Sequence, residues 1–369
     1  MSKYKLIFLQ PTIGAYRYDF YRKLLGLCGA KYSLKIYCSQ TDENNVRSVD
    51  SLGDNIFLYN SLSHTRILGG KFYWQSISVI KNIIERGDVL VVNGNPRYLS
   101  NLFLASYAKI KGAKIIWWGH GWTAGASEIN AKIRFFLMRN FDHVFLYTDA
   151  EVSKYGAIIR KKTNVSGLNN GVDVKEIRSN APVFRHNREG YKLCFIGRLE
   201  EKSRIDLLLD AVKILSNKGL IPPGFSVEII GDGSLVQLYK EQASSLKIDH
   251  FINWHGAIWD SSISNNILST CNAFVYPGLV GLSVVHAFAL GLPAIIHDNF
   301  HMQMPEASVV VDGQNGLLFK YLDPASLAEK INYIFSDRKL LSEMSRAAFN
   351  SVTASFNTED MAKRFFEQL

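Results

Sequence analysis

Short apolar runs alternate with longer amphipathic stretches along the whole chain. In the first half the runs predict strands, whereas residues 18–27 and 72–84 repeat their apolar positions with a helical period. The predicted strands of this half are residues 4–10, 33–38, 88–93, 113–119 and 143–148. Because single strands alternate with helices, the pattern indicates a parallel sheet covered by helices, which is an α/β domain of the doubly wound kind.

The same alternation returns in the second half. Its predicted helices are residues 205–216 and 326–335, followed by an amphipathic helix at 358–369. Its predicted strands are residues 192–198, 225–231, 252–256, 273–277, 293–298 and 309–312. Between residues 173 and 191 the periodicity is lost and polar residues dominate, which is typical of a linker.

These patterns predict two doubly wound α/β domains. The predicted division is a Rossmann-like N-terminal domain over residues 1–173, a linker over 174–190, a Rossmann-like C-terminal domain over 191–350 and a C-terminal helix over 351–369. A chain of 369 residues, of which 47% are hydrophobic, is large enough for two such cores.

Residues 276–293, YPGLVGLSVVHAFALGLP, join a strand to a glycine-rich turn and then to a helix. Gly278 and Gly281 let a ligand approach the backbone closely. The first amides of the helix, which have no acceptor within it, are those of Leu282, Ser283 and Val284. A helix N-terminus with such amides attracts anions, so a diphosphate is the expected occupant. We expect a buried helix over about residues 284–290 and a strand over 294–296.

The spacing of the cysteines and the lengths of the apolar runs indicate the compartment in which the protein is expected. The four cysteines are scattered and form no Cys-x-x-Cys pair, which disfavours a zinc site and a disulfide framework. The first ten residues have too short an apolar core for a signal peptide, and no other uninterrupted apolar run is long enough to span a bilayer. We therefore expect a cytoplasmic protein.

The excess of positive charge lies in the first half. Residues 1–170 hold 23 Lys and Arg against 11 Asp and Glu, a balance of +12, whereas residues 171–369 hold 19 against 22, a balance of −3. A basic face attracts anionic lipid headgroups, an anionic acceptor or nucleic acid, and the alternative is a soluble surface that happens to be basic. We expect no nucleic-acid partner, because no binding motif is present. Residues 132–139, KIRFFLMR, fit a membrane surface or an ordinary core helix with charged ends.

Glycine-containing loops follow several predicted strands, where open α/β sheets bind their ligands. Each loop alone is a weak signal, but together and in this order they indicate a ligand site. The loops are Gly14-Ala15-Tyr16-Arg17, Gly119-His120-Gly121-Trp122, Gly197-Arg198-Leu199 with Lys202 and Arg204, and Gly231-Asp232-Gly233.

These motifs resemble those of GT-B glycosyltransferases of the family 4 (group 1) type, which use nucleotide-sugar donors. The resemblance covers the second domain well and the first loosely. It rests on Asn170-Gly171-Val172-Asp173, Gly197-Arg198-Leu199 with Lys202, Gly231-Asp232-Gly233, residues 278–293, Pro305-Glu306 and residues 312–319. It implies two domains facing across a cleft, with the second gripping the nucleotide, the first meeting the acceptor and the last helix crossing back to the first.

The resemblance implies roles for residues in the second domain. Arg198 and Lys202 match the basic pair that neutralises charge on the departing diphosphate. The alternative is two exposed cations at a helix start. Because the family's lysine sits one position later and precedes a glycine, Arg204 is the other candidate for that role. The remaining donor-binding candidates are Gly231, Gly281, Leu282, Ser283, Val284 and Glu306.

In the first domain, His120 resembles the histidine that family members hold near the donor sugar, and its two glycine neighbours leave it little side-chain cover. Gly14 lets the backbone approach the diphosphate. Tyr16, Arg17 and Trp122 are the candidates for acceptor binding. Asp-x-Asp occurs nowhere in the chain, so we expect neither a metal nor another cofactor.

One departure from the family pattern stands out. The family carries two glutamates eight positions apart, and this chain has Gly278 and His286 there. A histidine still hydrogen-bonds a hydroxyl but does not clamp two neighbouring hydroxyls as a carboxylate does. Three interpretations are open: a donor sugar without the usual hydroxyl, a deoxyribose nucleotide, or a site that has lost activity. We favour an active enzyme with altered donor choice, in which His286 contacts the ribose.

The resemblance implies a glycosyltransferase that moves a sugar from a nucleotide-sugar to a glycan, without a metal and with retention of configuration. The basic first half favours a lipid-linked acceptor of surface polysaccharide assembly and a peripheral position at the membrane. A sugar-nucleotide epimerase and a non-catalytic GT-B partner subunit remain the alternatives. The sequence leaves the oligomeric state open.

Overall fold

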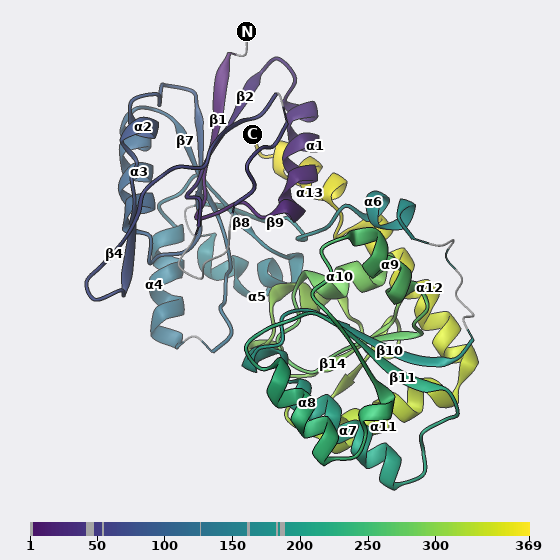
Figure 1. Ribbon diagram of the computed structural model, residues 1–369. Coiled ribbons are helices and arrows are strands. Elements are labelled where there is room, and N and C mark those ends of the chain that lie inside the picture. Colours follow the sequence, from purple (N-terminus) through teal and green to yellow (C-terminus); the bar gives the residue numbers. More distant parts are fainter. Residues whose placement is uncertain are drawn as a thin grey trace. The chain divides into compact units, whose positions relative to one another are not determined.

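The protein contains two compact units. The computed structural model describes residues 3–41, 48–53, 55–125, 127–160, 163–181, 184 and 189–369. One unit comprises Met1–Val172 with Thr358–Leu369, and the other comprises Asp173–Asn357 (Figure 1). The predicted linker, 174–190, begins with helix α6 (Val174–Ser179), and residues 182–183 and 185–188 of it lie outside the described residues.

The first unit is built on a parallel sheet with the strand order β3-β2-β1-β6-β7-β8-β9. Its strands are β1 (Tyr4–Leu9), β2 (Tyr32–Tyr37), β3 (Phe57–Tyr59), β6 (Val89–Asn93), β7 (Lys114–Trp118), β8 (His143–Leu146) and β9 (Asn164–Gly167). The central strands are buried on both faces, which explains their nearly continuous apolar sequences. The chain extends the sheet from β1 in two directions, so the topology switches between β1 and β6.

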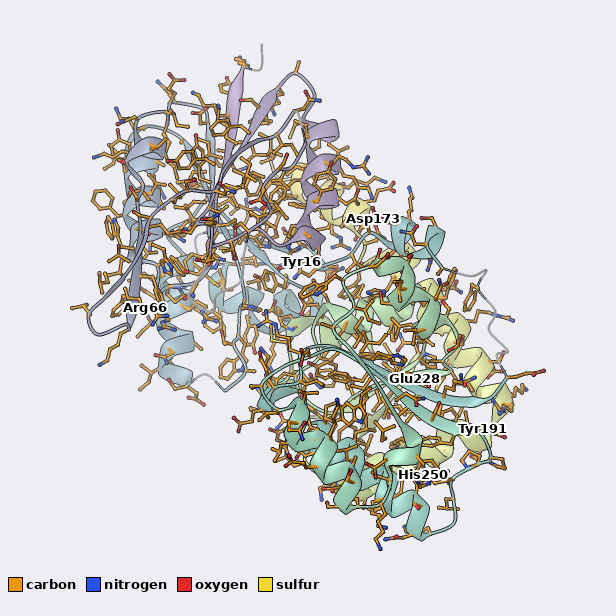
Figure 2. The ribbon with its side chains drawn as sticks, viewed as in Figure 1. Tyr16, Arg66, Asp173, Tyr191, Glu228 and His250 are labelled. Carbon is orange, nitrogen blue, oxygen red and sulfur yellow. The ribbon has the colours of Figure 1, made fainter. Side chains whose placement is uncertain are left out.

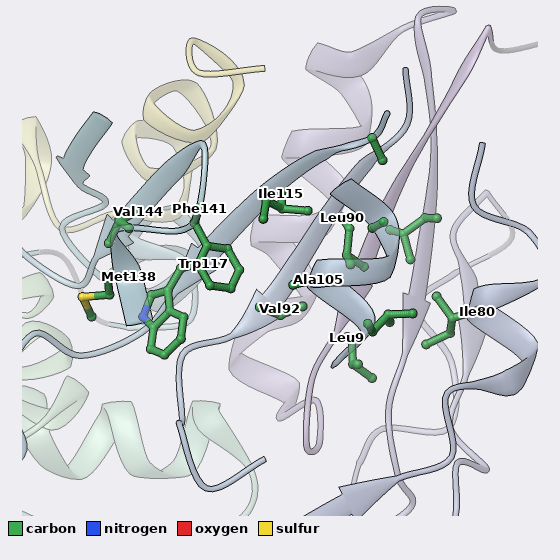
Figure 3. Close-up of a cluster of buried hydrophobic side chains, with 14 of the residues drawn as sticks. Leu9, Ile80, Leu90, Val92, Ala105, Ile115, Trp117, Met138, Phe141 and Val144 are labelled. Atoms are coloured by element: carbon green, nitrogen blue, oxygen red, sulfur yellow. The ribbon is translucent and has the colours of Figure 1, made fainter. Parts of the chain in front are cut away.

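Helices cover both faces of this sheet. One face carries α2 (Ser78–Lys81), α3 (Leu99–Ile110), α4 (Glu128–Met138) and α5 (Asp149–Ile159). Figure 3 shows part of the core on this face, in which Trp117 packs edge-on against Phe141 with ring centres 5.3 Å apart. The other face carries α1 (Tyr18–Cys28) and the C-terminal α13 (Thr358–Phe366).

Helix α13 completes the core of the first unit. It lies beside α1, although the two helices are at opposite ends of the chain (Figure 1). Phe365 is fully buried, and its ring contacts those of Phe8, Phe20 and Phe145. At the start of the helix, the hydroxyl of Thr358 donates to Asp19 of α1.

The second unit holds a six-stranded parallel sheet with the order β12-β11-β10-β13-β14-β15. Its strands are β10 (Tyr191–Ile196), β11 (Phe225–Ile230), β12 (Ile252–Gly256), β13 (Ala273–Tyr276), β14 (Ala294–His297) and β15 (Gly316–Phe319). Its other helices are α7 (Ile205–Asn217), α8 (Val236–Ser245), α9 (Ser261–Ser269), α10 (Leu282–Ala289), α11 (Pro324–Ser336) and α12 (Arg338–Ala354). Helix α7 contacts α8 and α11, and α10 contacts α6 and α12.

Two predicted elements are wrong. Residues 72–84 do not form one helix, because Phe72–Gln75 is strand β5, paired antiparallel with β4 (His64–Ile67). Gly69 and Gly70, with φ of 67° and 81°, form the turn between these two strands. Two consecutive glycines are a signal for a β-hairpin, and the prediction of a helix did not take it into account. Residues 309–312 form no strand either; the chain turns at Gly313 (φ 74°), and the edge strand is β15.

Two further properties concern the described residues. None of their helices is both long and apolar enough to cross a bilayer. The four cysteines, each of which is described, are all buried.

The aromatic contacts of α13 predict that this helix stabilises the first unit. Phe365→Ala removes a fully buried ring, so we expect the free energy of unfolding to fall by about 3–5 kcal/mol. Urea denaturation followed by tryptophan fluorescence measures this change. Phe366→Ala, in which a partly buried neighbour is truncated, is the matched control and should cost less. Equal losses in the two variants would contradict the packing described for Phe365.

Candidate functional site

The loops after β10 and β13 meet at the topological switch point of the second sheet. The chain continues from β10 to β11 on one side and from β13 to β14 on the other, so these two loops diverge and leave a crevice between them. At their base the N–H of Leu279 donates to the carbonyl of Lys202 (3.0 Å). A Cβ on Gly278 would lie 2.0 Å from the same carbonyl oxygen. Gly278 is therefore required by the packing of the two loops.

A pocket of about 390 Å³ opens at this junction. It is lined by Glu200, Glu201, Lys202, Arg204, Gly278, Leu279 and Tyr321. The lining places two cations, Lys202 and Arg204, and two acids, Glu200 and Glu201, beside the glycine turn. Such cations bind phosphate oxygens when an anionic ligand takes the place of the acid. The pocket lies wholly within the second unit.

Arg198 and Lys202 share a carboxylate. Lys202 Nζ lies 2.9 Å from one oxygen of Glu200, and Arg198 Nη1 lies 3.6 Å from the other. The hydrogen bond from Lys202 lowers the pKa of the Glu200 carboxyl, so this carboxyl is ionised at neutral pH. Sequence reasoning missed Glu200, although its position between two cations was a visible signal. Both cations are more than half exposed and remain accessible to a ligand.

Arg204 has a different partner. Its Nη2 lies 2.7 Å from Asp206, and its backbone is left-handed with φ of 52°. This left-handed region is one that glycine adopts more readily than other residues. Lys202 is the better candidate for a diphosphate contact, because its side chain is 54% exposed whereas that of Arg204 is 28% exposed.

The N-terminus of α10 follows the Gly278 turn. Gly281 precedes the helix, and a Cβ there would have only Met304 Cγ nearby, at 4.0 Å. Among the described residues, the N–H groups of Leu282 and Ser283 have no recorded acceptor. The expectation for Val284 was wrong, since its N–H donates to the carbonyl of Gly281 (3.2 Å). Two amides, rather than three, remain for an anion.

The turn itself is held by Gln303, which sequence reasoning also missed. Its side-chain oxygen accepts from the N–H of Val280 (2.9 Å), and its amide donates to the carbonyl of His297 (3.4 Å). Gln303 is almost fully buried, as is Glu306 in the following 3₁₀ turn, which contacts α10. These side chains fix the approach of the turn to the helix.

Gly231 supports the neighbouring turn. A Cβ on Gly231 would lie 1.8 Å from the carbonyl oxygen of Gly197, and φ is 147°. The N–H of Leu199 donates to the carbonyl of Asp232 (3.0 Å), so the loops after β10 and β11 are joined beside Arg198. Gly231 positions the basic turn through this contact.

His286 is anchored within the second unit. Its Nε2 lies 2.7 Å from the side-chain oxygen of Asn265, whose amide donates to the carbonyl of Ile177 (3.2 Å). Because the Asn265 oxygen is an acceptor, the imidazole carries its proton on Nε2, and Nδ1 is an acceptor. Burial lowers the pKa of His286 to about 4, so the ring is neutral. Asn265 was not predictable as the partner of His286, because the two residues lie on different helices, α9 and α10.

In the first unit, Gly14 and Arg17 follow β1. A Cβ on Gly14 would lie 2.5 Å from the ring of Tyr16, which is half exposed at the start of α1 (Figure 2). Arg17 does not face solvent. Its guanidinium is buried and lies 5.0 Å from the ring centres of both Tyr16 and Trp118.

His120 follows β7 and is more buried than the sequence indicated. The backbones of Gly119 and Gly94 touch, since a Cβ on either would overlap the other residue. The ring of His120 packs edge-on against Tyr147 at 4.2 Å, and its Nδ1 is inaccessible and has no recorded hydrogen-bond partner. Burial, followed by the charges of Arg134 and Arg17, lowers its pKa to about 3. The expectation that His120 has little side-chain cover was therefore wrong.

Glu151 of α5 holds the His120 loop. One carboxylate oxygen accepts from the N–H groups of Gly121 (2.8 Å) and Trp122 (3.4 Å), and the other accepts from Tyr147 (3.0 Å). Trp122 stacks on Tyr155 with ring centres 6.5 Å apart and is partly buried. Sequence reasoning missed Glu151, because helix α4, strand β8 and the start of α5 separate it from the histidine in the chain.

The described residues contain no cluster of three or more histidine, cysteine or acidic side chains that could hold a metal.

The structure brings together two groups of predicted residues, each within one unit. Arg198, Lys202 and the Gly278 turn meet in the second unit, and Arg17 and His120 lie within electrostatic reach of each other in the first.

Comparison with known proteins agrees with the geometry of the second unit. Residues 176–351 match the family model Glycosyl transferases group 1. The matched residues lie within the second unit, which spans Asp173–Asn357. No curated protein sequence matches the chain.

Solved structures resemble the whole chain at low sequence identity. Anabaena HepE in complex with UDP has a TM-score of 0.71 at 14% identity, covering 99% of each chain. A glycosyltransferase from Rickettsia africae also has a TM-score of 0.71 at 14% identity, covering 100% of this chain and 98% of that one. Sucrose-phosphate synthase from Thermosynechococcus elongatus has 0.70 at 15% identity, covering 99% and 98%. The predicted two-domain GT-B fold is confirmed.

The contact between Gly278 and the Lys202 carbonyl predicts that this position tolerates no side chain. Gly278→Ala should lower the free energy of unfolding by about 1–3 kcal/mol, because the added methyl overlaps a backbone atom. Gly281→Ala is the matched control and should cost less, since its Cβ enters open space. Thermal melting of both variants measures the difference. A Gly278→Ala variant as stable as the wild type would contradict the contact.

The neutral His286 predicts a pH dependence of stability. Its pKa of about 4 lies below the ordinary 6.5, so the unfolded chain binds a proton that the folded protein rejects. Stability is therefore unaffected above about pH 6.5 and falls as the pH drops toward 4, by up to about 1.4 kcal/mol per pH unit. His286→Gln removes this group, and its amide still donates to Asn265. Urea denaturation between pH 7 and pH 4.5 should give a shallower fall for the variant; parallel curves would refute the assignment.

Proposed function

We propose that the protein transfers a sugar from a nucleotide-sugar donor to a glycan acceptor, as a transferase of the group 1 type. The observation that carries the proposal is the pocket at the switch point of the second sheet, which is lined by Lys202, Arg204 and the Gly278 turn, just before the start of α10. Two cations and two helix amides match the charge and the hydrogen-bonding needs of a diphosphate.

The similar structures support this choice of ligand. Anabaena HepE was solved with UDP and with UDP-glucose, and another similar structure is WaaB, a lipopolysaccharide outer core galactosyltransferase. A nucleoside diphosphate in the second unit is the corresponding ligand here. Its diphosphate replaces Glu200 as the partner of Arg198 and Lys202, and these cations then stabilise charge on the departing nucleotide.

We further propose that transfer retains the anomeric configuration and uses neither a metal nor a covalent enzyme intermediate. The acceptor hydroxyl attacks from the face that the diphosphate leaves, and a diphosphate oxygen takes its proton. Catalysis then depends on positioning and electrostatics, so no general base is assigned. His120 is proposed to support the donor sugar as a neutral hydrogen-bonding group, in agreement with its lowered pKa.

Gly278 and His286 make the donor choice unusual. A carboxylate at position 278 has no room, because the Lys202 carbonyl occupies its place. At position 286 a neutral imidazole keeps Nδ1 as an acceptor, which suits a single ribose hydroxyl. These features favour an active enzyme with an altered donor over a site that has lost activity, since the basic pair is intact.

The acceptor is proposed to be a lipid-linked glycan, reached at an anionic membrane surface. Helix α4 buries Ala131, Phe135 and Met138 in the core, so the core-helix interpretation of this segment holds for one face. The opposite face exposes an apolar stripe of Ile129, Ile133 and Phe136. Lys132 and Arg139 flank the stripe within a strongly basic half of the chain.

Nucleotide binding tests the donor site. We expect UDP, GDP or dTDP to raise the melting temperature of the full chain, and a concentration about 100 times Kd adds about 2.7 kcal/mol of stability. The variant Arg198→Ala/Lys202→Ala should weaken that affinity at least about tenfold, because two charge-assisted contacts are lost. His286→Ala should weaken it less, through the ribose alone.

The outcomes separate the alternatives. Wild-type protein that no nucleoside diphosphate stabilises would be a non-catalytic partner subunit, and the proposal would fail. Consumption of a nucleotide-sugar without any acceptor would identify an epimerase. Unchanged donor affinity in His286→Ala would remove the ribose contact.

Vesicle binding tests the acceptor side. At low salt the protein should pellet with vesicles containing phosphatidylglycerol, and high salt should release it, because screening weakens the attraction. Ile133→Ser/Phe136→Ser should reduce the bound fraction if the α4 stripe inserts. Equal binding to neutral phosphatidylcholine vesicles would contradict an electrostatic contribution.

A further inference from the structure

Two arginines in the first unit, Arg17 buried and Arg134 partly buried, have no recorded acidic partner among the described residues. Arg134 lies on the core-facing side of α4, one turn from Ala131 and Met138, and its Nε is inaccessible without a hydrogen-bond partner among the described residues. Arg17 is 8% exposed, and the hydrogen bond recorded for its guanidinium is a weak one to Met361 Sδ (3.4 Å). No described carboxylate forms an ion pair with either guanidinium. Buried charges in proteins are normally paired or bound to a ligand.

The neighbouring acid is already in use. Glu151 is the carboxylate whose charge stabilises Arg134, but its two oxygens accept from the backbone of Gly121, Trp122 and Tyr147. Arg17, Arg134 and Glu151 together carry one net positive charge, and the neutral His120 adds none. His120 lies within the electrostatic reach of both arginines, and its Nδ1 has no recorded partner.

These groups gather where an α/β sheet binds ligands. Arg17 follows β1, His120 follows β7 and Tyr147 follows β8, all at the carboxyl ends of parallel strands. A guanidinium presents a planar fork that matches the oxygens of a phosphate or a carboxylate. Two guanidinium groups without a carboxylate partner lower the stability of the fold, and a bound anionic ligand compensates for that loss.

We propose that Arg134 and Arg17, with His120 beside them, form a binding site for a phosphate or carboxylate group of the acceptor. The assignment to the acceptor rests on the proposed function, which gives the donor diphosphate to Arg198 and Lys202 in the second unit. The basic balance of the first half then serves an anionic acceptor as well as a surface. Arg134 is the specificity-determining residue of this site.

Inorganic phosphate is the probe, and the full chain with Arg198→Ala/Lys202→Ala is the background, so that the donor site does not contribute. At constant ionic strength, phosphate should raise the melting temperature of this protein. Adding Arg134→Gln should weaken the apparent phosphate affinity about tenfold or more. Arg160→Gln, which changes an exposed arginine of the same unit, is the matched control and should leave phosphate binding unchanged.

Three further results decide the proposal. Without phosphate, Arg134→Gln should melt no earlier than its parent, because it removes a partly buried charge with no ion-pair partner; a structural arginine would instead lower the melting temperature. Should that variant fail to fold, Arg134→Lys keeps the charge but loses the fork and should weaken phosphate binding by a similar factor. Phosphate affinity unaffected by either substitution would overturn the site.

The source of the anion is tested with UDP. In otherwise wild-type protein, Arg134→Gln should leave UDP affinity unchanged, whereas Arg198→Ala/Lys202→Ala should reduce it. If Arg134→Gln weakens UDP as much as phosphate, the anion belongs to the donor, and the assignment to the acceptor is overturned. A wild-type protein that binds phosphate through Arg134 but no nucleoside diphosphate would refute the proposed function while leaving the anion site intact.

Discussion

The second unit depends on one backbone contact, the hydrogen bond from the N–H of Leu279 to the carbonyl of Lys202 (3.0 Å). It draws the basic turn after β10 onto the glycine turn after β13, and it requires that position 278 carry no side chain. The pocket lined by Lys202, Arg204 and Gly278 lies at this contact. The same contact leaves no room for a side chain at position 278, because a peptide group fills the space that it would need.

The first unit uses glycine in the same way. Gly94 and Gly119 bring the turns after β6 and β7 into backbone contact, and Glu151 then binds the amides beyond His120. The histidine is thereby buried and kept neutral. Each unit thus fixes a polar loop by close backbone packing at a strand end. Few side chains are then proposed to contact ligands. They are Lys202 and Arg198 in one unit, and His120 with Arg17 and Arg134 in the other.

Local patterns predicted much of the fold because doubly buried strands are continuous apolar runs, and helices α1, α7, α11 and α13 repeat with a clear period. The hairpin β4–β5 was missed because its aromatic residues also fit a helical repeat, and only the Gly69-Gly70 turn distinguishes the two. At the site, Arg198, Lys202 and His120 were predicted from motifs. Two other contacts were not predictable, because Asn265 reaches His286, and Glu151 reaches the amides beyond His120, through tertiary packing.

Hydrogen–deuterium exchange of the full chain with and without UDP tests the central claim most directly. Ligand in the switch-point pocket should slow exchange together in residues 198–204 and 278–284, because both loops would gain protection from one diphosphate. Amides elsewhere in the second sheet should change little. Protection confined to other segments, or no change at saturating UDP, would contradict a diphosphate site built on the contact between Lys202 and the Gly278 turn.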